Sequence, residues 1–260
     1  MNKFAGKTAL VTGASSGIGE SITRQLAEKH CNLILVARRE DKLNALKQVL
    51  ETQYDITVTT ISHDLATLEA GKSLYKKTQA LGLDVDILIN NAGYAKHGAF
   101  HVTPLDTHTD MMHLLTTTLT ELTYLYSEDM RRLGGGYILL VASIAGFMPI
   151  PQFATYAASK AFVLSLGESL NKELSEFNIN VTTLCPGGTA TEFMDVSGQN
   201  ITGFRRHAIM TSDSVAHAGL RAVAKGKAVI VPGLLYKISM AGLRAVPRGL
   251  QAMIGEAATK

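Results

Sequence analysis

Short apolar runs alternate along this chain with longer segments in which apolar residues recur every three or four positions. The runs are rich in Val, Ile, Leu and Thr, which is typical of strands that are covered on both faces. The segments between them are long enough for crossover helices. This alternation predicts a doubly wound α/β fold of the Rossmann type, with about seven mainly parallel strands and helices on both faces. The candidate strands are residues 8–12, 32–37, 56–61, 86–90, 137–143, 180–185 and 228–233.

No tract rich in Pro, Gly or Ser divides the chain, so we expect one domain over residues 1–260. A long helix is expected from Pro104 to about 132, because three glycines follow at 134–136. The segment 187–212 is rich in small and polar residues, which predicts an excursion near a substrate site.

Apolar residues at helical spacing predict a C-terminal helical extension at about 234–258, broken or restarted at Pro247. Packing against the domain or a second subunit is the first interpretation. Shallow membrane contact through Lys237, Arg244 and Arg248 is the alternative.

The charge balance argues against nucleic acid as a partner. The chain has 25 basic and 22 acidic residues, a net charge of +3, and no block of either sign. Cys31 and Cys185 stand in separate apolar runs without a metal-ligand partner, so we expect reduced thiols and a cytoplasmic location. We see no signal peptide and no apolar window long enough for a transmembrane segment.

A glycine-rich turn follows the first candidate strand. The sequence TGASSGIGE places Gly13, Gly17 and Gly19 between that strand and a helix. Glycines at this junction let backbone N–H groups approach a pyrophosphate at the positive end of the helix. A glycine triplet also fits a purely structural turn, but its position in the first βαβ unit favours a nucleotide-binding loop.

The end of the second candidate strand indicates which dinucleotide would bind. An acidic side chain there would accept hydrogen bonds from an adenosine ribose 2′-hydroxyl. The sequence has Ala37, Arg38 and Arg39 instead. Because guanidinium groups bind phosphates in a bidentate manner, Arg38, with Arg39 second, favours NADP(H). Two solvated arginines in a turn are the alternative.

Four further motifs follow in order: NNAG at 90–93, VASIAG at 141–146, YAASK at 156–160 and PGGTAT at 186–191. Together with TGASSGIG at 12–19, they resemble the short-chain dehydrogenase/reductase family over residues 5–195. The resemblance implies a nicotinamide-dependent oxidoreductase that interconverts a carbonyl and an alcohol. It implies that Tyr156 is the general acid/base, that Lys160 is its electrostatic partner and a ligand of the nicotinamide ribose, and that Ser143 donates a hydrogen bond to the substrate oxygen.

Elementary chemistry supports these roles. Tyr156 and Lys160 are four residues apart in a helical segment and therefore share a face. A phenol titrates near pH 10 in water, so Lys160 is expected to lower the pKa of Tyr156. Ser143 ends a candidate strand, where its hydroxyl could polarise a carbonyl. A packed tyrosine and a lysine that reaches solvent are the alternatives.

The resemblance also implies the remaining cofactor contacts: residues 91–93 beneath the adenosine ribose, Asp64 at the adenine and residues 186–191 at the nicotinamide carboxamide. A turn residue at a strand end is the alternative interpretation of Asn91. The full expected set is Gly13, Ser15, Ser16, Gly17, Ile18, Gly19, Arg38, Arg39, Asp64, Leu65, Asn91, Ala92, Gly93, Tyr156, Lys160, Pro186, Gly187, Thr189 and Thr191.

Mostly apolar residues follow these motifs, which suggests a hydrophobic small-molecule substrate. The expected substrate-binding residues are Tyr94, His97, Ser143, Phe147, Met148, Phe153, Phe193 and Met194. We expect no metal site, because Gly98 and Pro104 interrupt the run of His97, His101, His108 and His113 and no acidic cluster joins them.

Leu115 stands where the family usually has an asparagine that links the lysine to solvent. A leucine can neither donate nor accept a hydrogen bond, so Thr116, Thr117 or a water would have to replace it. This departure keeps open a second hypothesis, a nucleotide-binding sensor or scaffold with weakened catalysis. An epimerase or dehydratase is a third. The family commonly forms dimers or tetramers through its long helices, so we expect a homodimer or homotetramer through residues 104–132 and 152–176.

Overall fold

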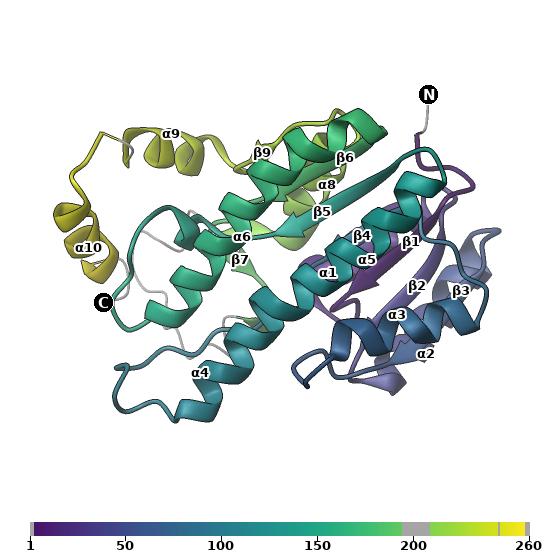
Figure 1. The fold of residues 1–260 in the computed structure, drawn as a ribbon, viewed down its shortest axis with the longest axis horizontal. Helices are drawn as coiled ribbons and strands as arrows, with labels where there is room; N and C mark the ends of the chain where they lie inside the picture. The colour runs from purple at the N-terminus through teal and green to yellow at the C-terminus, as the bar shows by residue number, and fades with distance from the viewer. Residues whose placement is uncertain (1–2, 194–208, 244, 258–260) are drawn as a thin grey trace.

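The computed structural model describes residues 3–193, 209–243 and 245–257, and a parallel β-sheet forms its centre (Figure 1). The strand order is β3-β2-β1-β4-β5-β6-β9, with every neighbouring pair parallel. The predicted doubly wound fold is therefore confirmed. The strands are β1 (Thr8–Thr12), β2 (Asn32–Ala37), β3 (Val58–Ser62), β4 (Ile87–Asn90), β5 (Gly136–Val141), β6 (Ile179–Leu184) and β9 (Val229–Ile230).

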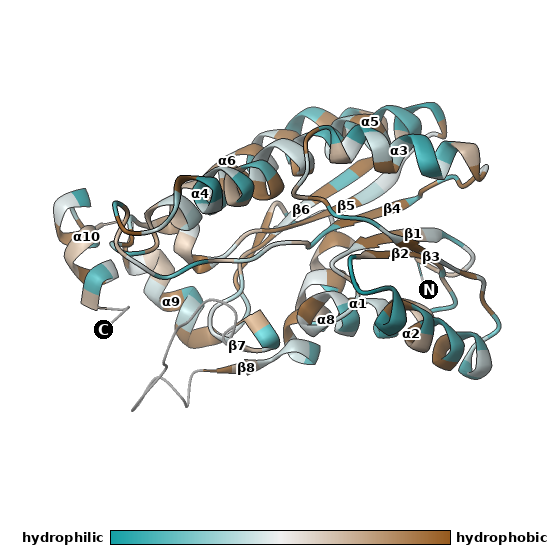
Figure 2. Ribbon diagram, turned by 90° about the horizontal axis from the view of Figure 1, so that it is seen from below, coloured by the Kyte–Doolittle hydropathy of each residue, from teal (hydrophilic) through white to brown (hydrophobic). Residues whose placement is uncertain are grey.

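Helices cover both faces of the sheet (Figure 2). Because successive strand residues point to opposite faces, Ala9 and Val11 pack against one layer and Leu10 against the other. One layer contains α1 (Gly17–Ala27), α2 (Glu40–Gln53) and α8 (Ser212–Val223). The other contains α3 (Ala70–Ala80), α5 (Leu119–Arg132) and α6 (Ala154–Glu173). Both faces are buried, which explains the nearly continuous apolar runs.

The strand order reverses between β1 and β4, which are neighbours in the sheet. The carboxyl ends of these strands meet at one edge, and open α/β sheets bind ligands there. The last strand differs from its prediction over 228–233, because β9 pairs only at Val229 and Ile230. It is an edge strand, and Pro232 stands two residues after its end, where a proline cannot donate to a ladder.

The long helix predicted from Pro104 is present but is not uniform. It consists of α4 (Leu105–Met112), a π-helical segment η1 (His113–Thr118) and α5. π-Helical segments occur frequently at functional sites. The second long helix, α6, is followed by the 3₁₀ helix η3 (Leu174–Phe177).

Part of the predicted excursion at 187–212 is described. Strands β7 (Thr189–Ala190) and β8 (Met210–Thr211) pair in parallel, while Met194 lies outside the described residues. Helices α9 (Leu234–Leu243) and α10 (Arg248–Ala257) occupy the predicted C-terminal extension. They expose Leu234, Leu235, Ile238, Leu250, Met253 and Ile254. In the described ranges, no helix combines the length and the apolarity needed to cross a bilayer.

Candidate active site

A cavity of about 640 Å³ opens at the carboxyl ends of the strands. Nearly all of the expected cofactor residues line it. They are Gly13, Ser15, Ser16, Gly17, Ile18, Arg38, Arg39, Asp64, Leu65, Asn91, Ala92, Gly93, Tyr156, Lys160, Pro186, Gly187, Thr189 and Thr191. Gly19 lies behind this surface, where a Cβ would overlap the carbonyl oxygen of Gly13.

The loop between β1 and α1 has a backbone conformation that suits an anion. Gly13 and Gly17 have φ values of +67° and +56°, which side chains other than glycine rarely adopt. Asn91 fixes the loop, because its Nδ2 donates to the carbonyls of Thr12 (2.9 Å) and Gly13 (3.3 Å). Ser16 precedes α1 and makes no capping bond through its side chain. The first amides of α1 therefore suit a phosphate, and the residues present fit a dinucleotide.

Charged side chains gather at the end of the cavity that lies next to the segment after β2. The Nε and Nη2 atoms of Arg39 donate to Ser15 Oγ at 3.4 and 3.2 Å. Arg39 Nη1 also pairs with Glu192 Oε2 at 2.8 Å, and Lys42 pairs with Glu192 Oε1 at 2.9 Å. These two cations lower the pKa of Glu192 to about 2, so its carboxylate is ionised at neutral pH.

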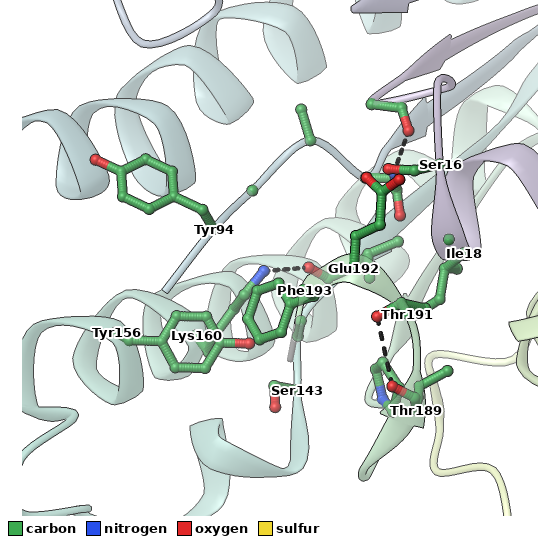
Figure 3. A pocket seen from close by; sticks show the side chains of 18 of the residues that line it. Ser16, Ile18, Tyr94, Ser143, Tyr156, Lys160, Thr189, Thr191, Glu192 and Phe193 are labelled. Atoms are coloured by element: carbon green, nitrogen blue, oxygen red, sulfur yellow. Dashed lines mark hydrogen bonds between the residues drawn. The ribbon is translucent and has the colours of Figure 1, made fainter. Parts of the chain in front are cut away.

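Ser143, Tyr156 and Lys160 converge from two elements (Figure 3). Ser143 follows β5 and caps the 3₁₀ helix η2 (Ile144–Phe147), where its Oγ accepts from the Ala145 amide at 3.1 Å. Tyr156 and Lys160 lie one turn apart on α6, and both are buried. The Lys160 ammonium lies 5.7 Å from the centroid of the Tyr156 ring.

The protonation of this pair differs from the expectation. Burial raises the pKa of Tyr156 to about 12, and a hydrogen bond with Ser143 opposes that rise. Burial also lowers the pKa of Lys160 to about 8. The Lys160 ammonium donates to the carbonyl of Val141 at 2.7 Å. The predicted lowering of the pKa of Tyr156 is therefore wrong for the protein alone, because desolvation of the buried phenol outweighs the hydrogen bond with Ser143.

Apolar and aromatic side chains surround the Tyr156 ring. The centroid of Phe193 lies 5.8 Å from it and that of Phe153 lies 6.1 Å from it. Tyr94 and Met148 also line the cavity, as expected. His97 and Phe147 are not among the lining residues: the His97 ring packs on Phe153 at 5.0 Å, and Phe147 packs against the core.

The family follows from comparison with known proteins. Residues 7–201 match the family model described as short chain dehydrogenase. The chain belongs to the short-chain dehydrogenase family. An uncharacterised oxidoreductase of Bacillus subtilis is 33% identical over 204 residues, which are 76% of this chain and 76% of that protein.

Solved dehydrogenases have the same fold. The enzyme from Sphingobium yanoikuyae, solved in complex with NADPH, is 31% identical with a TM-score of 0.82 over 95% of this chain and 98% of that one. The bulky-bulky ketone specific alcohol dehydrogenase from Comamonas testosteroni is 29% identical with a TM-score of 0.78, over 95% and 96% of the two chains.

In this short-chain dehydrogenase, Leu115 lies against the NNAG motif. It is buried in η1, and a Cβ built on Gly93 would lie 2.7 Å from Leu115 Cδ2 and 3.8 Å from Lys160 Nζ. Leu115 and Lys160 therefore both border Gly93. The hydroxyl of Thr116 donates to the carbonyl of Met112 at 2.6 Å, and Thr117 is exposed. In the described ranges the Lys160 ammonium donates to the carbonyl of Val141 and to no side chain, so neither threonine replaces the asparagine.

Several lining residues of this short-chain dehydrogenase escaped the sequence analysis. They are Leu114, Ile150, Glu192, Ile209 and Tyr236. The hydroxyl of Tyr236 accepts from the amide of Gly188 at 3.1 Å, and a Cβ on Gly187 would overlap its ring. No motif marks these positions. Across the described ranges, no group of three or more His, Cys, Asp or Glu is placed to hold a metal ion.

Proposed function

We propose that this protein is an NADP(H)-dependent oxidoreductase that interconverts a ketone or aldehyde and an alcohol on a hydrophobic small molecule. The observation that carries the proposal is the convergence of Ser143, Tyr156 and Lys160 at the apolar end of a cavity whose other end is lined by Arg38 and Arg39. When bound, the nicotinamide would supply or accept the hydride.

The residues of the chain handle the proton and the substrate oxygen. With a pKa of about 12, Tyr156 is protonated at neutral pH and can donate to the oxygen of a carbonyl as it is reduced. Ser143 hydrogen-bonds to the same phenol and can hold that oxygen in place. Lys160, with a pKa of about 8, is largely cationic at neutral pH and favours the phenolate that the donation leaves.

The preference for NADP(H) rests on the residues after β2. Arg38 and Arg39 line the cavity where an NAD-specific protein would have a carboxylate at the strand end. The NADPH bound to the Sphingobium enzyme supports this assignment by similarity. The aromatic residues around Tyr156 favour a hydrophobic substrate, and the ketone specificity named for the Comamonas enzyme points in the same direction.

Turnover with a panel of substrates tests this function. Purified protein is incubated with NADPH or NADH and a series of aldehydes and ketones of increasing apolar bulk, and absorbance at the nicotinamide band is followed. We expect faster oxidation of NADPH than of NADH, with bulky apolar ketones among the substrates. Equal rates with both cofactors would contradict the assignment of the arginines.

A nucleotide-binding sensor or scaffold with weakened catalysis is the second candidate. Leu115 favours it, because no described side chain links Lys160 to solvent. NADPH binding without turnover of any substrate in the panel would support it.

We also propose a homodimer or homotetramer. Helices α4, α5 and α6 border a second cavity of about 770 Å³, whose lining includes the exposed residues Phe100, Met112 and Phe162. Apolar surface of this kind is typical of a protein interface. The unpaired, buried thiols of Cys31 and Cys185 suit the proposed cytoplasmic location.

A further inference from the structure

Glu192 brings a negative charge to the end of the cavity where the proposed cofactor carries its 2′-phosphate. It lies two residues after β7, and Figure 3 shows it next to Phe193. One carboxylate oxygen accepts from Arg39 Nη1 at 2.8 Å and the other accepts from Lys42 Nζ at 2.9 Å. The chain thus places an acid at the adenosine end from a segment about 150 residues away from β2.

Arg39 has no pair of guanidinium nitrogens free for a bidentate contact with a phosphate in its present arrangement. Its Nε and Nη2 face the hydroxyl of Ser15, and Nη2 also lies 3.3 Å from the Ser15 carbonyl. Its Nη1 is bound to Glu192. Each nitrogen of the guanidinium therefore already has an acceptor, so a bidentate contact between Arg39 and a phosphate has to displace Glu192 from Nη1 or Ser15 from Nε and Nη2.

Arg38 differs from Arg39 in its ion pairing. It lines the same cavity, and its guanidinium makes no ion pair with any carboxylate in the described part of the chain. One guanidinium is therefore available to an incoming anion and the other is held by an internal anion.

We propose that Glu192 sets the coenzyme specificity by competing with the 2′-phosphate for Arg39 and Lys42. This inference rests on the proposed use of NADP(H). The carboxylate repels the phosphate and offers an acceptor to the free 2′-hydroxyl of NAD(H). Glu192 therefore makes the preference for NADP(H) over NAD(H) weaker than the arginines alone would give.

The adenosine halves of the two cofactors test the competition without any catalytic step. Isothermal titration measures the affinities of 2′,5′-ADP and 5′-AMP for the wild-type protein and for Glu192→Gln. In Glu192→Gln we expect the affinity for 2′,5′-ADP, relative to that for 5′-AMP, to rise about three- to tenfold, since two exposed ion pairs no longer have to be broken. Glu128→Gln is the matched control, because it removes the same charge from an exposed pair with Arg131 outside the cavity.

A double-mutant cycle assigns the effect to the ion pair. In an Arg39→Gln background, Glu192→Gln should change the ratio of the two affinities by a smaller factor than in the wild type. Thermal melting of each variant checks that it is folded. An unchanged or lower ratio in Glu192→Gln would overturn the inference. The wild-type preference for 2′,5′-ADP separately tests the proposed cofactor, so the two failures are distinguishable.

Discussion

The ammonium of Lys160 donates to the carbonyl of Val141 at 2.7 Å and lies 5.7 Å from the centroid of the Tyr156 ring. Both side chains are buried, and burial moves their pKa values in opposite directions, to about 8 for the lysine and about 12 for the tyrosine. The proton is therefore held on the phenol at neutral pH, and the positive charge lies near enough to stabilise the anion that its transfer leaves.

Lys160→Met should change how stability depends on pH. Folded Lys160 releases its proton above about pH 8, whereas the unfolded chain keeps it until about pH 10.5. Because the unfolded state then binds more protons, the free energy of unfolding of the wild type should rise relative to that of the variant between pH 8 and 10. The gain is at most about 1.4 kcal/mol per pH unit.

Urea denaturation of both proteins at pH 7, 8, 9 and 10 measures this difference. Above pH 10 the raised pKa of Tyr156 acts in the opposite direction, because the folded phenol keeps its proton longer than the unfolded one. Parallel stability curves from pH 8 to 10 would show that the lysine titrates normally in the fold.

Gly93→Ala should lower stability because of Leu115. The new Cβ would lie 2.7 Å from Leu115 Cδ2, which is closer than a van der Waals contact, so we expect a loss of about 1–3 kcal/mol. Leu115→Ala removes the clashing atom. The double variant should therefore lose less than the sum of the two single losses. Strictly additive losses in urea denaturation would contradict the proximity of these two residues.

Leu115→Asn should restore a polar link near Lys160. Burying an amide at this position costs about 1–3 kcal/mol of stability if its hydrogen bonds are incomplete. We expect kcat for carbonyl reduction at neutral pH to rise several-fold, because proton transfer by positioned groups contributes to the rate. Leu115→Ala is the control for the loss of volume. A kcat for Leu115→Asn no higher than that of Leu115→Ala would show that the missing asparagine does not limit turnover.

Phe162→Asp should disrupt the proposed oligomer. Phe162 lies on the exposed side of α6 beside the second cavity, and a carboxylate there would be buried without a partner in an interface. Light scattering at micromolar concentration should give an oligomer for the wild type and a monomer for the variant. Lys172→Asp, farther along α6 and outside that cavity, is the control and should leave the mass unchanged.

The sequence predicts the parts of this protein that depend on local pattern. The side chains of Ile34 and Val36 pack against one helix layer, and that of Leu35 packs against the other. Because both faces of β2 are buried, its sequence is a continuous apolar run, which made the strand predictable. The pair Tyr156 and Lys160 was predictable for a similar reason, because helical spacing alone sets its shared face.

Long-range contacts are the part that sequence patterns do not contain. Glu192 accepts a hydrogen bond from Arg39, which is 153 residues away in the sequence. Tyr236, on a helix that contains no recognisable motif, accepts one from the amide of Gly188. The prediction that the pKa of Tyr156 is lowered was wrong for the same reason. The sequence shows a lysine one turn away, but the burial that raises the pKa of Tyr156 arises from the packing of distant segments.

Carbonyl reduction by Tyr156→Phe tests the central claim most directly. The substitution removes only the hydroxyl that donates the proton, and Tyr54→Phe, at the end of α2 and outside the cavity, is the matched control. With NADPH and the best ketone from the panel, we predict a loss of at least about 100-fold in kcat/KM for Tyr156→Phe, with unchanged NADPH affinity and wild-type rates for Tyr54→Phe. Undiminished reduction by Tyr156→Phe would contradict the mechanism.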